Sequence, residues 1–415
     1  MAALLISGCV VASTALWRSN IAEPAAARSI ASAMSSDGAI YQGYQANGAI
    51  WLRKLDSTGA TLWQQAVAAG NLLALVPADD GAVIMVTSNR EVLLINNDGT
   101  TAWTQEAAPA GTRISSWSRY ANDRFYLGYT AATSAGLVAL DADGAMVWSH
   151  VLDDGSDDGL AFTPQALAVF SSGEVLAKLL VEATEVPMTR ESQLYAFDSD
   201  GALVTAHDAD INARLLDNQH SAFLLTGADV QRVDETGNPL WTHSFAEANP
   251  NVTYARCAGD QNLEVACSYT VYEPDVRFDN VVAWLNADGD VRAEHRSLVV
   301  TTAYQYASQL YFAGNRTWIQ QRDANQNLAS IPLLFESPEE RWQTLQVLQD
   351  DGTLQQTLIM RSTIKSRYLC SDILHGCERT NRTGDSISNV LADDSQLYVV
   401  GNRGSQGFIS SYALD

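Results

Sequence analysis

Short runs of alternating hydrophobic and polar residues fill most of the chain, and each run ends at a turn signal. One run covers 137–141 (LVALD), and Gly144 follows three residues after its last residue, Asp141. A carboxylate at Asp141 is placed to accept hydrogen bonds from turn amides, and Gly144 supplies the positive φ of a tight hairpin loop with a bulge. The pattern therefore predicts a β-hairpin, with Val147 and Trp148 on opposite faces of its second strand.

The same hairpin is repeated along the chain. Clear copies read LDSTGATLW at 55–63, LINNDGTTAW at 94–103, LDADGAMVW at 140–148 and VDETGNPLW at 233–241. Weaker copies at 197–205 and 285–293 have Thr205 and Ala293 where the clear copies have Trp. An apolar run that predicts another strand precedes each hairpin, as in GAIYQGYQ at 38–45, and most copies have one more short segment before it. Each repeat is therefore expected to contain three or four strands.

Repeats of this kind at intervals of roughly 35 to 60 residues are typical of propeller blades. Helical periodicity of any length is absent, which excludes solenoids built from helix pairs. Counting the middle strands predicts an all-β fold, an eight-bladed β-propeller of four-stranded antiparallel blades. A seven- or nine-bladed ring and an open β-solenoid are the alternatives.

The two ends of the chain complement each other. The last repeat, FISSYALD at 408–415, stops at its Asp, while STALW at 13–17 has the register of GATLW at 59–63. The N-terminal segment is therefore expected to supply the outermost strand of the last blade, with Thr14 to Trp17 pairing with Phe408 to Leu414, and so to close the ring. An open solenoid would not explain these complementary ends.

No Pro-, Gly- or Ser-rich linker divides the chain, so 9–415 is expected to form a single propeller domain. Residues at about 335–386 fit the repeat least well. They contain a possible extra hairpin at 342–360, and we interpret the whole range as an insertion between the last two blades.

The N-terminal segment suggests a lipoprotein signal peptide at 1–8. Ile6, Ser7, Gly8 and Cys9 resemble a bacterial lipobox, in which the chain is cut before the Cys and the thiol receives a lipid. The basic segment that usually precedes a lipobox is missing, so an ordinary core strand is the alternative. Val10 in place of Asp after the Cys favours, by resemblance, the outer membrane. The sequence thus predicts a periplasmic protein that is anchored to the membrane by lipid at Cys9.

The other four cysteines form two local pairs. Cys257 with Cys267 would link neighbouring strands, and Cys370 with Cys377 would close a short loop inside the insertion. Disulfides suit an oxidising periplasm, and the spacing resembles no zinc ribbon. We therefore predict two disulfides, with no metal site and no cofactor.

A formal net charge of -23, with only three lysines, makes nucleic acid an improbable partner. Four of the six histidines fall six residues after a turn Gly. Equivalent positions in successive blades lie on the order of 15 Å apart, too far to share a metal, so we interpret these side chains as packing positions. They are His150, His207, His243 and His295.

The repeats resemble the PQQ-like propeller family, whose blade motif is A-x-D-x-x-T-G-x-x-x-W, and the resemblance covers nearly the whole chain. Ala139, Asp141, Gly144 and Trp148 match the motif, although the turn is one residue shorter here. In that family the Trp packs between blades. The resemblance includes two functional classes: lipid-anchored scaffolds of the BamB type, and quinoprotein dehydrogenases, which carry a vicinal Cys-Cys pair and hold calcium.

The chain has no Cys-Cys dipeptide, which favours the scaffold over a quinone-dependent dehydrogenase. The sequence therefore predicts a non-enzymatic scaffold that binds envelope proteins at the outer membrane, a monomeric ring within a complex. An accessory subunit of envelope transport or of hydrophobic-substrate uptake is the alternative. The expected docking element is the insertion, whose second half is locally basic on an acidic protein. Its basic residues are Arg361, Lys365, Arg367, Arg379 and Arg382.

Overall fold

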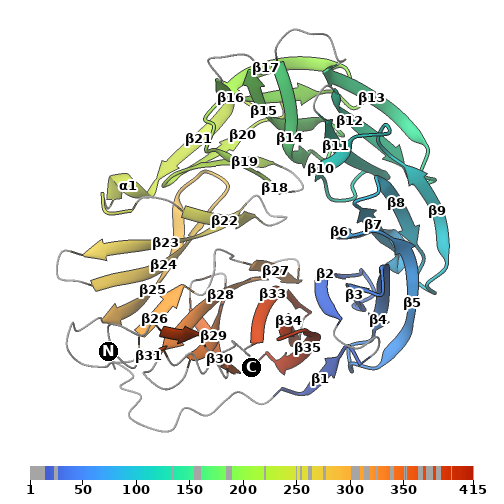
Figure 1. Cartoon of the computed structure of the whole chain (residues 1–415). Coiled ribbons are helices and arrows are strands. Elements are labelled where there is room, and N and C mark those ends of the chain that lie inside the picture. Colours follow the sequence, from blue (N-terminus) through green and yellow to red (C-terminus); the bar gives the residue numbers. More distant parts are fainter. Residues whose placement is uncertain are drawn as a thin grey trace.

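Strands surround a central axis, and successive sheets stand side by side to form a ring (Figure 1). The computed structural model describes residues 15–414 except 23–26, 132–133, 154–159, 184–188, 219–220, 249, 253–254, 260–263, 274–276, 301–308, 313–317, 324–325, 337–340, 350, 352, 363–367, 371–376, 380–384 and 394. In each sheet one strand lies nearest the axis and the last lies at the circumference (Figure 1). The fold is an all-β propeller, as the repeats predict.

Six four-stranded antiparallel sheets, here called blades, follow the chain in order, each strand bonded to the next. The first three contain β2 (Arg28–Met34), β3 (Ile40–Ala46), β4 (Ala49–Leu55) and β5 (Thr61–Ala69); β6 (Leu72–Pro77), β7 (Val83–Thr87), β8 (Glu91–Ile95) and β9 (Thr101–Glu106); and β10 (Arg113–Trp117), β11 (Arg124–Ala131), β12 (Ser134–Asp141) and β13 (Met146–Asp153).

The next three blades contain β14 (Leu160–Val169), β15 (Val175–Ala183), β16 (Arg190–Phe197) and β17 (Leu203–Ala209); β18 (Arg214–Asp217), β19 (Ala222–Thr226), β20 (Asp229–Val233) and β21 (Pro239–Ser244); and β22 (Ala255–Gly259), β23 (Val265–Glu273), β24 (Arg277–Leu285) and β25 (Val291–Val300). A short 3-10 helix, η1 (Asp79–Gly81), joins β6 to β7, and helix α1 (Phe245–Ala248) follows β21.

The seventh blade joins the two ends of the chain. It contains β33 (Asp385–Ala392), β34 (Gln396–Arg403), β35 (Gln406–Ala413) and, outermost, β1 (Trp17–Asn20). Strand β1 runs antiparallel to β35, with Trp17 opposite Ser411 and Asn20 opposite Phe408. The predicted closure by the N-terminal strand is present, but the paired residues are Trp17–Asn20 with Phe408–Ser411, and Thr14 lies outside the described residues.

The prediction of eight four-stranded blades is wrong, because the described residues form seven. Between the β22–β25 blade and the seventh blade lies a five-stranded sheet of β26 (Gln309–Phe312), β27 (Trp318–Asp323), β28 (Gln326–Glu336), β29 (Arg341–Leu348) and β30 (Leu354–Ser362). Both β26 and β27 pair with β28, which is long enough to take one short strand along each half. The position of a single blade strand is therefore shared by two strands.

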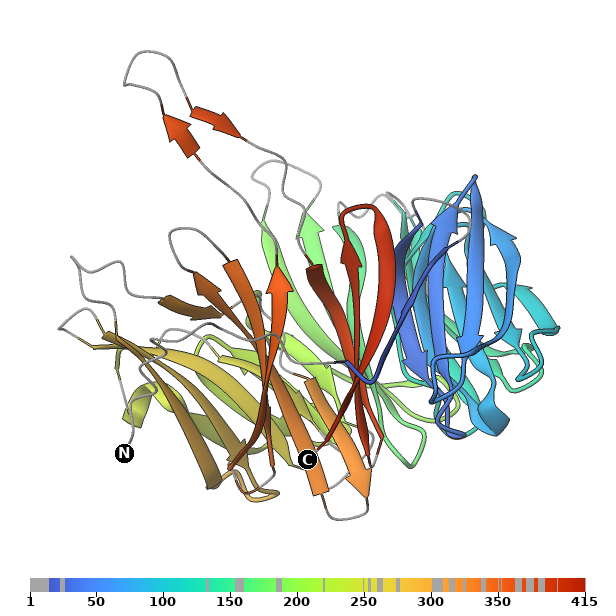
Figure 2. The same cartoon turned by 90° about the horizontal axis from the view of Figure 1, so that it is seen from below.

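The range 335–386, interpreted from the sequence as an insertion, contributes to three sheets, the last of them the seventh blade through Asp385 and Ser386 of β33. Its first part forms β29 and β30, which extend the five-stranded sheet through the hairpin at 342–360. A separate two-stranded sheet follows, of β31 (Tyr368–Cys370) and β32 (Cys377–Arg379). Figure 2 shows this pair standing well away from the ring. No helix among the described residues is long and apolar enough to cross a membrane.

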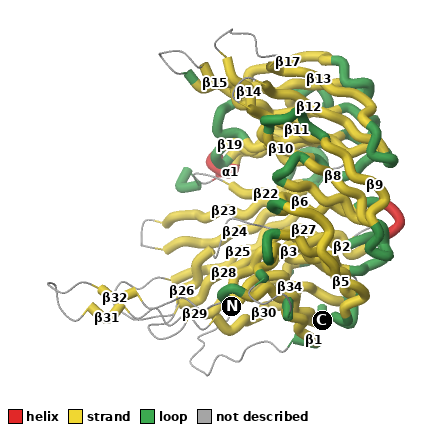
Figure 3. The backbone as a smooth tube through the Cα atoms, turned by 45° about the vertical axis from the view of Figure 1, so that its right-hand side comes forward, coloured by secondary structure: helices red, strands yellow, loops and turns green. Residues whose placement is uncertain are grey.

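The turns between third and fourth strands have the predicted geometry. Gly144 has φ +78°, and Asp141 Oδ1 accepts hydrogen bonds from the amides of Asp143 (3.0 Å) and Ala145 (2.8 Å). The register of β12 and β13 shifts next to the turn, which is the predicted bulge. Figure 3 shows that loops and turns join strands almost everywhere in the described chain.

Apolar side chains fill the spaces between neighbouring blades. One cluster combines Ile84 and Val86 of β7 with Phe125 and Leu127 of β11, all fully or almost fully buried. Because each blade buries both faces against its neighbours, the inner strands are near-continuous apolar runs. A ring of this kind needs every interface to be sealed, including the one at which the chain ends meet.

A buried arginine seals that last interface. Arg53 on β4 is 2% exposed, and its guanidinium donates to the carbonyl oxygens of Ser19 (3.2 Å) and Asn20 (3.1 Å) on β1. Its Nε donates to Gln42 Oε1 at 2.7 Å. Burial lowers the pKa of Arg53 to about 10, and the guanidinium therefore stays charged at neutral pH. One side chain thus holds the closing strand against the β2–β5 blade.

Replacing this arginine should loosen the closure. We expect Arg53→Leu to destabilise the protein by about 3 kcal/mol, because buried carbonyl oxygens and the Gln42 amide lose a charged partner. Urea denaturation of the variant measures this loss. Arg28→Leu, at an exposed position on β2, is the control and should change stability by less than about 0.5 kcal/mol. Equal midpoints for Arg53→Leu and the parent protein would contradict this role for Arg53.

Candidate functional site

A tryptophan on the outer strand of a blade crosses to the turn of the next blade. The ring lies against the turn glycine so closely that no side chain would fit there. A Cβ at Gly144 would lie 2.5 Å from the Trp103 ring, and one at Gly99 would lie 3.1 Å from the Trp63 ring. The predicted packing of the repeat Trp between blades is confirmed at five interfaces of the described chain. The five are Trp17 on Gly59, Trp63 on Gly99, Trp103 on Gly144, Trp148 on Gly201 and Trp241 on Gly289.

In four of these interfaces the indole N–H donates to the carbonyl two residues before the glycine. The bonds are Trp17 to Ser57 (2.9 Å), Trp63 to Asn97 (2.9 Å), Trp103 to Ala142 (2.7 Å) and Trp241 to Ala287 (2.8 Å). A half-buried indole thereby keeps a partner for its only polar group. At the fifth interface Arg124 donates to the equivalent Ser199 carbonyl, and within the described residues the Trp148 N–H has no partner.

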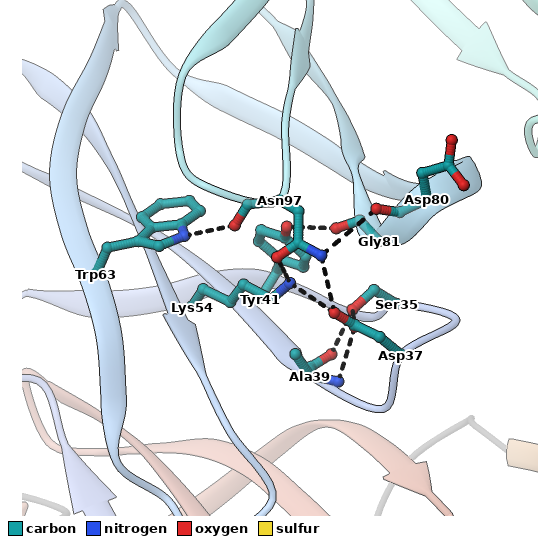
Figure 4. Close-up of polar contacts among 9 residues, drawn as sticks. All are labelled: Ser35, Asp37, Ala39, Tyr41, Lys54, Trp63, Asp80, Gly81 and Asn97. Atoms are coloured by element: carbon teal, nitrogen blue, oxygen red, sulfur yellow. Dashed lines mark hydrogen bonds and ion pairs between the residues drawn. The ribbon is translucent and has the colours of Figure 1, made fainter.

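A polar cage surrounds a buried lysine at one of these interfaces (Figure 4). Lys54, on β4, is fully buried, and its Nζ lies 3.0 Å from Asp37 Oδ2 and 2.6 Å from Asn97 Oδ1. Asn97 Nδ2 also donates to Asp37 Oδ2 at 3.0 Å, and its backbone carbonyl accepts the Trp63 N–H. The cage therefore joins the β2–β5 blade to the turn of the next blade.

The neighbours of Asp37 in the cage determine the pKa of its carboxyl group. Burial alone would raise the pKa of Asp37, but hydrogen bonds from the Ser35 hydroxyl and from Lys54 outweigh that effect and lower its pKa to about 2. Tyr41, whose ring lies 5.0 Å from the Lys54 ammonium, donates its hydroxyl to the Gly81 carbonyl at 2.6 Å. Burial raises the pKa of Tyr41. These neighbours hold the Lys54 side chain in place, so the cage stabilises the interface.

A second lysine is buried in the β14–β17 blade. Lys178 is 2% exposed, and its Nζ donates to Gln165 Oε1 at 2.8 Å. Burial lowers its pKa, and the nearby Asp210 carboxylate raises it in part. Sequence reasoning missed both buried lysines. The available signal was their placement inside apolar strand runs of a chain that has only three lysines.

The repeated histidines are spread over the ring. The His150 ring meets Phe197 of the next blade edge-on, with 4.9 Å between ring centroids, and the His243 ring meets Phe245 at 4.7 Å. Burial lowers the pKa of His150. The predicted packing role is confirmed for these two histidines. No group of three or more His, Cys, Asp or Glu side chains among the described residues could hold a metal ion.

One of the two predicted disulfides is present. Cys257 on β22 and Cys267 on β23 are opposite each other and bonded, which links neighbouring strands as expected. Cys370 and Cys377 are opposite each other on β31 and β32, and their bond stays a prediction. Cys9 lies outside the described residues.

The predicted basic docking residues are divided between strands and undescribed segments. Arg361 lies on β30 and Arg379 on β32. Lys365, Arg367 and Arg382 lie outside the described residues. The described residues therefore include only two of the five, and the docking role of this segment stays a prediction.

Apolar side chains recur on the outer circumference of the ring, immediately before the repeat position that is Trp in three of these blades and Thr205 in the fourth. Leu62, Val147, Val204 and Leu240 are 42% to 56% exposed. They point away from the interface that the next residue seals, because successive strand residues face opposite sides. We call these four side chains the apolar rim. Single exposed apolar residues are ordinary, but recurrence at one register is a candidate binding surface.

A family model described as "Outer membrane protein assembly factor BamB" matches residues 10–177. That range contains the first three blades and part of the fourth. A search of the curated proteins finds no match.

Solved structures show the same fold at low sequence identity. The quinohemoprotein alcohol dehydrogenase ADHIIG from Pseudomonas putida HK5 is 11% identical, with a TM-score of 0.52, and the match covers 97% of this chain and 76% of that one. The Dos1 propeller is 12% identical with a TM-score of 0.52, covering 96% and 94%. BamB from Moraxella catarrhalis is 18% identical with a TM-score of 0.36, covering 79% and 81%. The family match over residues 10–177 confirms the resemblance to PQQ-like propellers, and the dehydrogenase and the Dos1 propeller share the propeller fold.

The cage generates a pH prediction. The pKa of Asp37 lies below the ordinary value of 3.8, so its carboxylate stabilises the fold at neutral pH, and this stabilisation is lost as the pH falls from about 4 to about 2. The carboxylate is 42% exposed, so screening limits the effect to about 1 kcal/mol. We expect Asp37→Asn to be less stable than the parent at pH 6 and to lose less stability on acidification.

The control is Asp80→Asn, because the Asp80 carboxylate points away from the cage in Figure 4. Thermal melts between pH 2.5 and 6 should give parallel curves for this control and the parent protein. If Asp37→Asn gives a curve parallel to both, the ion pair does not contribute to the pH dependence.

Proposed function

We propose that this PQQ-like β-propeller is a non-enzymatic scaffold that binds other proteins at the bacterial envelope, with a lipid on Cys9 as its anchor. The observation that carries the proposal is the apolar rim, which recurs on the outer strands of a closed ring. A rigid ring presents such side chains at fixed spacing, so the scaffold loses little conformational entropy when a partner binds them.

Exposed apolar side chains are most numerous on two neighbouring blades, where they include Val147 and Val204 of the apolar rim. Strands β13 and β17 expose five large apolar side chains at 42% to 56% exposure: Met146, Val147, Val151, Leu203 and Val204. Exposed apolar side chains that gather on one surface favour protein binding. These outer strands also end their sheets, so their backbone groups are available to an added strand.

The family match supports the same reading. Residues 10–177 match a model that is named for an outer membrane assembly factor, and this range includes all of β13. We extend to this chain the envelope location and the binding role that the description implies. A local basic segment, with Arg361, Lys365, Arg367, Arg379 and Arg382, is proposed as a second contact for acidic partners.

Lipidation is tested by mass. We expect intact protein purified from its native membrane to begin at Cys9 and to carry a diacylglycerol group, because residues 6–9 resemble a lipobox. Intact-mass spectrometry reads the result directly. Cys9→Ser should release the protein from the membrane fraction. Detection of an unmodified chain that begins at Met1 would refute the anchor.

The binding role is tested by co-purification from solubilised envelopes. We expect the double variant Val147→Glu and Val204→Glu to lose at least one protein that co-purifies specifically with the parent chain, because charges replace apolar contacts on β13 and β17. Ala102→Glu, at the same register on β9, where no large apolar side chain stands, is the matched control and should retain every co-purifying protein. Charge reversal at Arg361, Lys365 and Arg367 tests the basic segment in the same assay. If the double Glu variant and the charge-reversal variant both retain every co-purifying protein, the proposed binding surfaces are refuted.

A further inference from the structure

Strand β17 is the outer edge of its blade and lies at the circumference of the ring (Figure 1). Within the described residues it pairs only with β16, in a regular register from Thr205 opposite Ala196 to Ala209 opposite Ser192. Its sequence, LVTAHDA, contains no lysine, arginine or proline, which are residues that protect exposed edges. The outward N–H and C=O groups of this stretch are therefore available to a further strand.

The charge on β17 favours one sign in an added strand. Asp208 is exposed and is the one carboxylate on β17, so the edge repels an anionic strand and attracts a cationic one. Two other outer strands differ: β21 begins with Pro239, and β25 contains Arg292 and Arg296. Proline and like charge make those two edges less suitable for a cationic strand.

A cleft of about 300 Å³ lies between β17 and the next blade. Its lining extends along β17 from the turn at Gly237 to the connection that contains Asp210 and Ala213. Ala209, four residues after the repeat position, lines the cleft, whereas β13 has the larger Leu152 at the same spacing from its Trp. A small side chain at this position therefore leaves room between the two blades.

The lining of the cleft combines apolar side chains with carboxylates. Leu194, Leu224 and Pro239 are apolar, and Asp208 and Asp210 are acidic and exposed. None of the described lining residues is a lysine or an arginine. Lysine and arginine place their methylene groups against apolar surface and their charge next to carboxylates. The cleft therefore fits a long cationic side chain.

One buried cation near the cleft has to be counted. The Lys178 Nζ donates to Gln165 Oε1 at 2.8 Å and to the Ile211 carbonyl at 3.4 Å, and Lys178 does not line the cleft. The Asp210 carboxylate is close enough to raise the pKa of Lys178 in part. Because two carboxylates line the cleft and one ammonium lies behind it, a further cation is still attracted.

We infer that β17 is the docking edge for an extended segment of a partner protein, and that a lysine or arginine of this segment enters the cleft. Directly opposite residues on neighbouring strands face the same side of a sheet, so a side chain opposite His207 or Ala209 points between the blades. Main-chain hydrogen bonds to β17 supply affinity, and the cleft selects the side chain.

The occupant is a different protein, because a second copy of this chain would bring another formal charge of -23 to the same edge. This site depends on the binding role proposed above, and it specifies the kind of segment that the ring binds.

Fluorescence anisotropy with the purified full chain tests the site. The probe is a labelled peptide with blocked ends, in which threonine and valine alternate and lysine is central. We expect a dissociation constant on the order of 10 to 100 µM. Binding should weaken about threefold as the ionic strength rises from about 0.05 to about 0.3 M. A peptide with methionine in place of lysine has a similar stem without the charge, and it should bind about tenfold more weakly.

Variants of the chain locate the lysine. Ala209→Leu supplies the larger side chain of β13 and should weaken binding of the lysine peptide about tenfold. Ala206→Leu, at an exposed position on the opposite face of β17, is the size control and should bind as the parent does. Asp210→Asn should remove most of the preference for lysine over methionine. Asp200→Asn, in a turn of the same blade outside the cleft, is the charge control and should keep that preference.

Strand addition has its own control. A lysine peptide methylated at all its backbone nitrogens keeps its side chains but cannot pair as a strand, so it should not bind at about 1 mM. Equal binding by the methylated peptide would overturn the inference, as would equal binding by Ala209→Leu and the parent. Absence of lysine-peptide binding at about 1 mM would also overturn it. If co-purification still depends on Val147 and Val204 in that case, the scaffold role stands without this site.

Discussion

The ring depends on one contact, the indole that reaches from an outer strand to the turn of the next blade. Blades that radiate from an axis move apart toward the circumference, so a large side chain is needed to fill the space between them. Tryptophan buries on the order of 150 to 250 Å² and brings one N–H, which four of the described interfaces bond to a turn carbonyl. The turn residue beneath must be glycine, because at Gly144 a Cβ would lie only 2.5 Å from the ring.

Closure of the ring extends this contact to the interface at which the two ends of the chain meet. Strand β1 completes the last blade, so Trp17 on it seals the interface with Gly59 as its counterparts do elsewhere. Buried polar groups add to the same junction: Arg53 bonds the β1 carbonyls, and Asn402 Oδ1 accepts from the Ser29 amide at 2.7 Å. The hydrogen bonds of these groups are favourable, and they form only in the right geometry. They therefore select one partner strand for the end of the chain.

Sealing residues and outward residues alternate along the same outer strands. At the five described interfaces that an indole seals, the residue that faces the interface is Trp. Residues that face outward, such as Val147 and Val204, form the apolar rim. Because strand residues alternate in direction, the outward row can differ between blades without a change in the sealing row.

Local chemistry determined much of this protein from the sequence alone: the Asp–Gly turns, the hairpins, the packing role of Trp, the pairing of the chain ends and the Cys257–Cys267 bond. Each is encoded within a few residues or in a repeated register. The tertiary structure decided the rest. Strands β26 and β27 share β28 through pairings that no local pattern encodes, so counting repeats predicted one four-stranded blade too many. Lys54 meets Asp37 and Asn97, which lie 17 and 43 residues away in the sequence, so the cage forms only when two separately encoded blades face each other.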